Sequence, residues 1–398
     1  MKYIVVLCDG MSGYPLESLG NKTTMETAVK PNMERLASEG IVGTVKTVPK
    51  GMPPGSDVAN LSAMGFDPLE CYTGRSPLEA VSMGVKMEGT DVAFRCNLIT
   101  LTDESDYTNK IMADYSAEEI TTEESLPIIN ALNEAFKSEK IEFYHGISYR
   151  HCMIWKGGPG ELGLVPPHDI SDKLIGEYLP KDAVLIDIMK KSYDVLKDHP
   201  INVERVKNGF NPANAIWLWG EGTKPAIENF EETTGLKGAV ISAVDLIKGI
   251  GLCAGMEVLD VEGATGNINT NFANKGLAAY NALKNGNDYV YVHIEAPDEC
   301  GHRGDTGNKI KSIEYIDEKV IGPLLKMLDD DGEEYKVMVM PDHATPIATK
   351  THAIDPVPFL IYDSRKKVKG ISAFTEKNAE NTGLFFSSGK NLAKFFLK

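Results

Sequence analysis

The feature of this sequence that most constrains its fold is a set of three short apolar runs, each ending in acidic or histidine residues. The runs and their following residues are Tyr3–Leu7 before Cys8-Asp9-Gly10, Tyr289–Ile294 before Glu295 and Asp298, and Lys336–Met340 before Pro341-Asp342-His343. Such runs with helical segments between them are typical of parallel strands buried on both faces. Open α/β sheets bind ligands at the carboxyl ends of their strands, so the pattern predicts a functional site where these polar residues meet.

The predicted fold class is α/β, with a mostly parallel sheet flanked by helices. Ala28–Glu39 and Ile310–Leu328 have the apolar periodicity of amphipathic helices. The middle of the chain differs, because strands alternate there with helices such as Thr122–Ser138, but no cluster of metal-binding residues follows them. We therefore predict a smaller α/β domain of residues 90–206, inserted into a main domain of residues 1–89 and 207–398.

The charge and cysteine content narrow the class of protein. The 398 residues carry a formal net charge of −16, which argues against a nucleic-acid or anionic-membrane binder but allows a small phosphorylated substrate held by a few local cations. The six cysteines form no Cys-x-x-Cys pair, as expected for reduced thiols. The apolar run at the start is too short for a signal peptide, and no run reaches the roughly 18 apolar residues of a membrane span. We expect a cytoplasmic protein whose oligomeric state the sequence leaves open.

Six residues at or near the predicted strand ends are candidate metal ligands. They are Asp9, Asp298, His302, Asp342, His343 and His352. Oxygen and imidazole donors without a thiolate suit Mn²⁺, which we favour, or Zn²⁺ or Mg²⁺, and do not suggest a structural zinc site. Six groups exceed the needs of one ion, so we predict two, and a pair about 3.5–4 Å apart is the usual device for phosphoryl transfer. Each of these residues taken alone also fits a turn, a helix cap or an ordinary hydrogen bond. Because the clusters follow strands of one predicted sheet, the set as a whole favours metal binding.

A candidate nucleophile lies in the segment "VPKGMPPGSDVANLSAMGFDP". Pro53-Pro54-Gly55 predict a rigid loop, after which Ser56 opens a helix. A serine at this place is commonly a helix N-cap. The alternative is that Ser56 faces an anion at the helix N-terminus, where free N–H groups favour phosphate, and that a bound metal activates its hydroxyl.

On these residues the chain resembles the cofactor-independent phosphoglycerate mutases, in the shorter form typical of archaea and some bacteria, which belong to the alkaline phosphatase superfamily. The similarity extends nearly from end to end. The motifs that carry it are Asp9-Gly10, "PPGSDVANLSAMGFDP", "YTGRSPLEAVSMG", "DVAFRCNL", "HIEAPDECGH", "MPDHATP" and Thr351-His352. The metal motifs alone indicate only the superfamily, whereas the serine loop and "GRSPLE" indicate this branch.

The resemblance implies an alkaline phosphatase-like main domain, a substrate-capping insert, two metal ions and no 2,3-bisphosphoglycerate. Asp298, His302 and His352 are expected to hold one ion. Asp9, Asp342, His343 and the Ser56 oxygen are expected to hold the other, and Ser56 is expected to accept the phosphoryl group and return it to another hydroxyl of the same substrate. The expected substrate-binding cations are Lys275, Arg75, Arg95, Arg150 and His168, since guanidinium groups match phosphate and carboxylate.

One segment departs from the family pattern. The chain has "MADYSAEEI" at Met112–Ile120, where we expect arginines of the kind found in the archaeal enzymes. The resemblance therefore leaves a homoserine kinase-type phosphotransferase as the alternative, with Glu118 and Glu119 facing an ammonium group. A phosphatase, a phosphopentomutase and a non-catalytic metal-binding protein are more distant alternatives. The leading prediction is a mutase interconverting 3-phosphoglycerate and 2-phosphoglycerate through phosphoserine 56.

Overall fold

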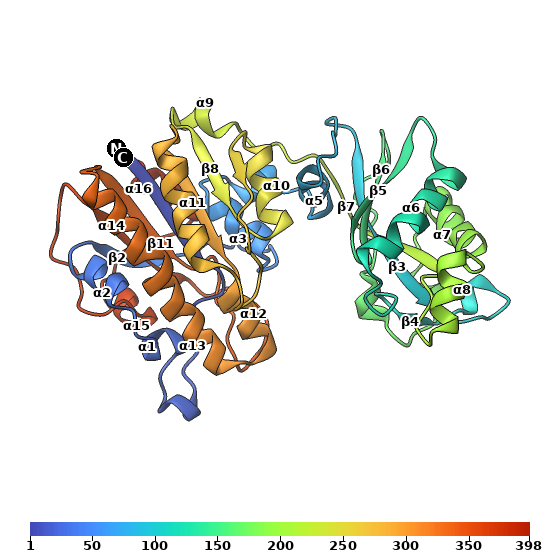
Figure 1. Cartoon of the computed structure of the whole chain (residues 1–398), viewed down its shortest axis with the longest axis horizontal. Helices are drawn as coiled ribbons and strands as arrows, with labels where there is room; N and C mark the ends of the chain where they lie inside the picture. Colours follow the sequence, from blue (N-terminus) through green and yellow to red (C-terminus); the bar gives the residue numbers. More distant parts are fainter. The chain divides into compact units, whose positions relative to one another are not determined.

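The computed structural model describes all 398 residues, which form two compact units (Figure 1). One unit consists of Met1–Tyr72 and Ala226–Lys398, and the other of Thr73–Pro225. The second unit extends beyond the predicted insert of residues 90–206 at both ends. At the start, helix α5 (Ser76–Ser82) packs against strands of that unit, and at the end, strand β7 (Ala215–Thr223) pairs with strand β3 (Val92–Leu101). None of the helices has the length and apolar character needed to cross a membrane.

An eight-stranded sheet forms the centre of the first unit, in the order β13-β2-β12-β11-β1-β10-β8-β9. Its strands are β1 (Lys2–Cys8), β2 (Ile41–Val45), β8 (Gly238–Ile241), β9 (Glu257–Leu259), β10 (Tyr289–Ile294), β11 (Tyr335–Met340), β12 (Val357–Asp363) and β13 (Phe385–Phe386). The five neighbours from β11 to β9 are parallel, and only β12 runs antiparallel to the strands on either side of it. The three predicted strands are confirmed as β1, β10 and β11, which lie side by side.

Helices flank this sheet, as the α/β prediction requires. They are α1 (Thr24–Thr27), α2 (Pro31–Ser38), α3 (Ser56–Ala63), α4 (Pro68–Cys71), α9 (Phe230–Thr234), α10 (Asp245–Cys253), α11 (Phe272–Lys284), α12 (Ala296–Arg303), α13 (Thr306–Tyr315), α14 (Gly322–Asp330), α15 (Glu376–Asn381) and α16 (Gly389–Phe396). Ile4 and Val6 of β1 pack in one fully buried cluster with Val320, Ile321 and Leu324 of the helical layer. The core therefore lies directly beneath the strand ends that carry the predicted ligands.

The helix predicted over Ala28–Glu39 was wrong at its start. The structure ends α1 at Thr27 and begins α2 only at Pro31, with Lys30 between them at φ −139°. The ring of a proline disfavours helical geometry in the residue before it, so the chain resets at Lys30. The helix predicted over Ile310–Leu328 spans α13, a π-helical turn η5 (Ile316–Ile321) and α14 without a break.

The second unit is built on an antiparallel sheet. Its strands are β3 (Val92–Leu101), β4 (Met112–Asp114), β5 (Ile141–Ile147), β6 (Arg150–Trp155) and β7 (Ala215–Thr223), and its main helices are α6 (Thr122–Phe136), α7 (Ala183–Leu196) and α8 (Pro200–Lys207). Strand β3 pairs with both β6 and β7, so it is the central strand. Helices α6 and α7 pack against this sheet, and α6 confirms the predicted acidic helix to within two residues of its end.

A buried histidine in this sheet gives the second unit a testable response to acid. His151 of β6 is 4% exposed, stacks on His145, and has no hydrogen-bond partner for Nε2. Burial, with a smaller effect of His145, lowers the pKa of His151 to about 3. The unfolded chain binds a proton near its ordinary pKa of about 6.5, so stability from neutral His151 is present above that pH and is lost as the pH falls from there toward 3.

We predict that His151→Asn, which keeps an acceptor for the Gly146 N–H, reduces the loss of stability between pH 7 and pH 5 by about 2 kcal/mol. Urea unfolding at both pH values, followed by fluorescence, measures this. The same acid loss in His151→Asn as in the unsubstituted protein would contradict the assignment.

Candidate metal centre and nucleophile

The strand register brings the predicted ligands to one edge of the sheet. Leu7 of β1 lies beside His293 of β10 and Met340 of β11, so the loops after these three strands begin at the same level. Asp9 follows β1 and Asp342 follows β11, while α12 starts directly after β10 and carries Asp298 and His302 one turn apart. The parallel strands therefore bring together residues that lie more than 300 positions apart in the sequence.

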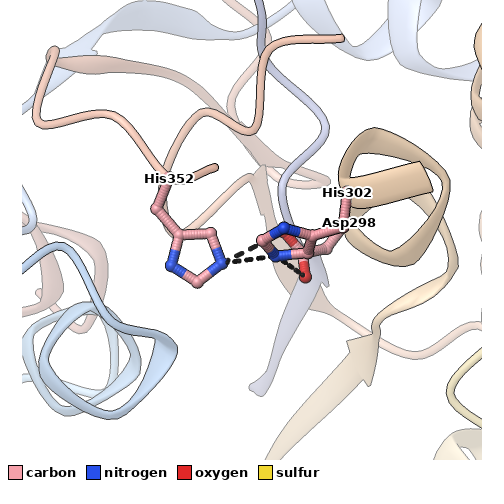
Figure 2. Close-up of side chains that lie close together, drawn as sticks. All are labelled: Asp298, His302 and His352. Carbon is pink, nitrogen blue, oxygen red and sulfur yellow. Dashed lines mark hydrogen bonds and ion pairs between the residues drawn. The ribbon is translucent and has the colours of Figure 1, made fainter. Parts of the chain in front are cut away.

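Asp298, His302 and His352 form the first ligand group (Figure 2). His302 Nε2 lies 3.2 Å from Asp298 Oδ2 and 2.9 Å from His352 Nε2. Its Nδ1 lies 2.9 Å from the Lys350 carbonyl and donates to it, so Nε2 is the ring nitrogen that faces the group. A hydrogen bond to Asp298 raises the pKa of His302 to about 9, so an incoming cation displaces a proton here.

Asp9, Asp298 and His343 form the second group, and all three are buried. Asp298 belongs to both groups, whereas the resemblance implies that it holds only one of the two ions. His343 Nε2 lies 3.6 Å from Asp9 Oδ1 and 3.3 Å from Asp342 Oδ2, so Asp342 adjoins this group. The Thr345 hydroxyl donates to Asp298 and therefore accepts from His343 Nδ1 at 3.2 Å, which frees Nε2 of His343 for an ion.

The electrostatics of the second group fit a cation. Asp9 is 1% exposed, and its Oδ1 has no hydrogen-bond partner. Burial raises the pKa of Asp9 well above its usual range, and the nearby carboxylates of Asp342, Asp298 and Glu295 add to the rise. Several carboxylates in one buried place are costly unless a cation offsets their charge. The donor set of oxygen and imidazole atoms thus matches hard or borderline divalent ions.

Only glycine fits at position 10, between the two groups. Gly10 has φ +61°, and a Cβ built on it would lie 2.7 Å from Asp298 Oδ1. The N–H of Gly10 donates to Asp342 Oδ1 at 3.2 Å. The Asp9-Gly10 motif therefore lets the backbone after β1 pass close to the acidic residues from β11 and α12.

Ser56 faces the second ligand group. It is the first residue of α3; Gly55 occupies the N-cap position, and no side chain caps this helix. The interpretation of Ser56 as a helix N-cap is therefore not supported. Its Oγ lies 3.1 Å from His343 Nε2. Asn60, one turn later, donates to both the Ser56 carbonyl and Asp342 Oδ2 at 2.8 Å, which ties the start of α3 to the metal-binding loop.

Sequence reasoning did not single out Asn60, His293 or Thr345. His293 is the one histidine in the apolar run of β10 and lies 2.9 Å from Asp9 Oδ2. Burial lowers the pKa of His293 to about 3. A histidine inside an otherwise apolar strand was the available signal for it, whereas Asn60 and Thr345 offered none.

Lys275 lies beneath the site. Its side chain is fully buried on α11, and Nζ donates to the carbonyl of His293 at 3.1 Å. Burial lowers the pKa of Lys275 to about 8, and the Glu295 carboxylate opposes that change. In this structure the lysine supports the strand that leads to the ligand groups.

Three predicted substrate-binding cations gather in the second unit around Glu79. Arg75 Nε lies 2.7 Å and Arg95 Nε 3.0 Å from the two oxygens of Glu79. Burial alone would raise the pKa of Glu79, but Arg95, Arg75 and Arg150 together hold it below its usual range. Arg150 starts β6, beside Asn97 of β3.

His168 is linked to these arginines by the ring of Trp219. The Arg95 guanidinium lies 4.5 Å from the centre of the Trp219 ring, and His168 packs edge-on to that ring at 5.5 Å. Arg75, Arg95, Arg150, His168 and Trp219 are called the arginine cluster below. Three guanidinium groups against one carboxylate leave an excess of positive charge, which suits an anionic ligand.

The segment Met112–Ile120, which departs from the family pattern, consists of β4 (Met112–Asp114) and the turn that leads from it toward α6. Ala117, Glu118 and Glu119 all have positive φ angles, between 47° and 55°. The Glu118 carboxylate accepts the N–H of Asn211 at 2.8 Å. Glu118 therefore stabilises its own unit, and its carboxylate is engaged there.

Several known proteins are similar to this chain over its full length. The family model described as 2,3-bisphosphoglycerate-independent phosphoglycerate mutase matches residues 37–202. A protein of that name from Methanothrix thermoacetophila is 48% identical over 400 residues, and one named as probable from Geobacter sulfurreducens is 47% identical over 401; both alignments cover 100% of each chain. The solved cofactor-independent phosphoglycerate mutase of Thermoplasma acidophilum is 26% identical with a TM-score of 0.70, covering 100% of this chain and 99% of that one.

The fold and the site together define a class of α/β proteins that carry a candidate metal centre and a serine at the carboxyl ends of parallel strands. Within that class, the chain belongs to the 2,3-bisphosphoglycerate-independent phosphoglycerate mutase family. The predicted resemblance is thereby confirmed. The comparisons give the homoserine alternative no support.

Proposed function

We propose that this chain interconverts 3-phosphoglycerate and 2-phosphoglycerate through a phosphoserine at Ser56, with two divalent ions, Mn²⁺ being favoured. The observation that carries the proposal is the position of Ser56 Oγ, 3.1 Å from His343 Nε2 at the edge of two buried ligand groups. Family membership supplies the substrate class. We expect this reaction of a small phosphorylated metabolite to take place in the cytoplasm.

Asp298, His302 and His352 would hold one ion, and Asp9, Asp342, His343 and Ser56 the other, with Asp298 close enough to serve both. When bound, such ions lower the pKa of a coordinated hydroxyl and neutralise the charge of a phosphoryl group. The chain supplies the geometry. Asn60 fixes the start of α3, and Thr345 orients Asp298 and His343 toward each other.

The phosphoryl group is transferred in two steps, first to Ser56 and then back to the glycerate. Ser56 Oγ attacks the phosphorus of 3-phosphoglycerate; the Oγ–P bond forms as the bond from phosphorus to the 3-oxygen breaks. The released 3-hydroxyl gains a proton, which offsets the one that Ser56 loses. The 2-hydroxyl of the same glycerate then attacks the phosphoserine; the bond from phosphorus to the 2-oxygen forms as the Oγ–P bond breaks. The proton that the 2-hydroxyl loses is matched by the one that Ser56 regains, and 2-phosphoglycerate forms without a bisphosphorylated cofactor.

Glycerate has to stay bound between the two phosphoryl transfers. We propose that the arginine cluster of the second unit retains it. Its excess positive charge suits the carboxylate, which the substrate keeps throughout. From family membership we also propose that the inserted domain caps the substrate and that Lys275 contributes to substrate binding.

We predict that Arg150→Ala lowers kcat/KM for 3-phosphoglycerate roughly ten-fold or more, since a charge-assisted hydrogen bond contributes about 1.5–3 kcal/mol. Arg365→Ala is the matched control, because Arg365 is a half-exposed arginine of the first unit paired with Asp363. Steady-state kinetics with both variants decide the point. Equal kcat/KM in Arg150→Ala and Arg365→Ala would remove Arg150 from the substrate site.

The activity itself is tested with purified, Mn²⁺-loaded protein and 3-phosphoglycerate, with no 2,3-bisphosphoglycerate present. Formation of 2-phosphoglycerate, followed by ³¹P NMR, is the expected result. A parallel assay with homoserine and a nucleotide donor serves as the negative control. Absence of 2-phosphoglycerate, with phosphate appearing on homoserine, would overturn the proposal.

A further inference from the structure

One buried side chain beside the ligand groups, His293, has no role in the transfer described above. It lies in the middle of the sheet on β10 and is fully buried. Both of its ring nitrogens have partners: Nε2 lies 2.9 Å from Asp9 Oδ2, and Nδ1 lies 3.1 Å from Ser242 Oγ. Burying a polar ring in the core of a parallel sheet costs free energy unless its nitrogens have hydrogen-bond partners. The partners of His293 therefore indicate what the ring does.

The hydrogen bonds around His293 specify one tautomer. An Asp9 that binds a cation is ionised and can only accept, so the proton must lie on Nε2 of His293. Nδ1 of the neutral ring is then an acceptor, and the Ser242 hydroxyl donates to it. Ser242 Oγ is itself oriented by the backbone N–H of Val244, which donates to it at 3.0 Å.

The backbone of His293 is fixed as well. Lys275 Nζ donates to its carbonyl, and β10 pairs with β1 and β8 on its two sides. The ring is thus held at both nitrogens and at the main chain. Its Nε2–H points at one oxygen of Asp9 from a rigid strand.

We infer that His293 is a positioning residue that makes Asp9 a metal ligand through Oδ1 alone. His293 occupies Oδ2, whereas Oδ1 is buried, has no hydrogen-bond partner, and lies on the side of His343. Asp9 without this hydrogen bond can rotate and offer either oxygen. The inference rests on the proposed function only in taking Asp9 as a metal ligand.

The test measures metal binding directly, without substrate. We expect His293→Leu, which removes the donor, to weaken Mn²⁺ binding at the Asp9 group by roughly 10- to 100-fold, as loss of a hydrogen bond to a metal ligand typically does. His293→Gln can place an amide N–H near the position of Nε2, and it should recover most of that affinity. His151→Leu is the matched control, because His151 is a buried strand histidine of the other unit. Calorimetry with Mn²⁺ and metal analysis after dialysis give the values.

A second readout does not depend on any substitution. In Zn²⁺-loaded protein labelled with ¹⁵N-histidine, His293 should show a protonated Nε2 and an unprotonated Nδ1. Unchanged Mn²⁺ affinity in folded His293→Leu, or a neutral His293 with its proton on Nδ1, would overturn the inference. If His293→Leu does not fold, two measurements remain as the test. They are the Mn²⁺ affinity of His293→Gln and the position of the His293 proton in the ¹⁵N spectrum.

These outcomes separate the inference from the proposed function. A protein with no mutase activity whose Mn²⁺ affinity falls in His293→Leu would refute the function and support the positioning role. A mutase whose Mn²⁺ affinity does not change in His293→Leu would support the function and refute the positioning role.

Discussion

Ser56→Ala is expected to lower mutase turnover by roughly 10⁴-fold or more while leaving the fold and the metal content nearly unchanged. The hydroxyl oxygen is the atom that takes the phosphoryl group, and alanine offers no substitute. Structural damage should be small, because Gly55 holds the N-cap position and no side chain caps α3. Turnover of 3-phosphoglycerate, circular dichroism and metal analysis on one preparation test all three parts.

Ser62→Ala is the matched control for this variant. Ser62 lies on the same helix, is 1% exposed, and accepts the N–H of Gly389 at 3.1 Å, so it is a buried serine with a structural hydrogen bond. We expect it to cost some stability and to leave turnover within a few-fold. Equal turnover in Ser56→Ala and Ser62→Ala would end the phosphoserine mechanism.

Asp298→Asn is expected to abolish activity and to lower metal content further than Asp342→Asn does. Asp298 lies in both ligand groups, whereas Asp342 adjoins only the second. Burial alone would raise the pKa of Asp298, but hydrogen bonds from His302 and His352 hold it well below its usual range, so it is an ionised ligand at neutral pH. Metal analysis after dialysis against Mn²⁺-free buffer should find fewer than one ion per chain in Asp298→Asn.

The control for that variant is the neighbouring Glu299→Gln. Glu299 lies on the same turn of α12 but pairs with Arg303 on the outer face, so the substitution removes a nearby negative charge and no ligand. It should retain the metal content of the unsubstituted protein. Two ions per chain in Asp298→Asn would contradict the assignment of Asp298 to either group.

Much of the first unit could be predicted because its strands are short, apolar and buried on both faces. β1, β10 and β11 follow from that pattern to within one residue at either end. Parallel pairing then forces their carboxyl ends to one edge, so Asp9, Asp298 and His343 could be predicted as neighbours from sequence. The start of α2 was missed because a rule for the residue before proline overrides the apolar periodicity of Ala28–Glu39.

The features that sequence could not predict depend on side-chain direction and on contacts across the fold. Asp298 serves two groups because α12 carries it between His302 and His343, which no spacing in the sequence reveals. Glu79 gathers Arg75 and Arg95 only because α5 packs against β3. His293 is a residue of the core by pattern, and only the strand register places its Nε2 on Asp9.

Mass spectrometry of the Mn²⁺-loaded protein, quenched during turnover of 3-phosphoglycerate, tests the phosphoserine directly. We expect a phosphoryl group on the peptide that contains Ser56, at a level that rises and falls with turnover and is absent in Ser56→Ala. Formation of 2-phosphoglycerate with no phosphoryl group on that peptide at any quench time, or with one on another residue, would contradict the phosphoserine mechanism.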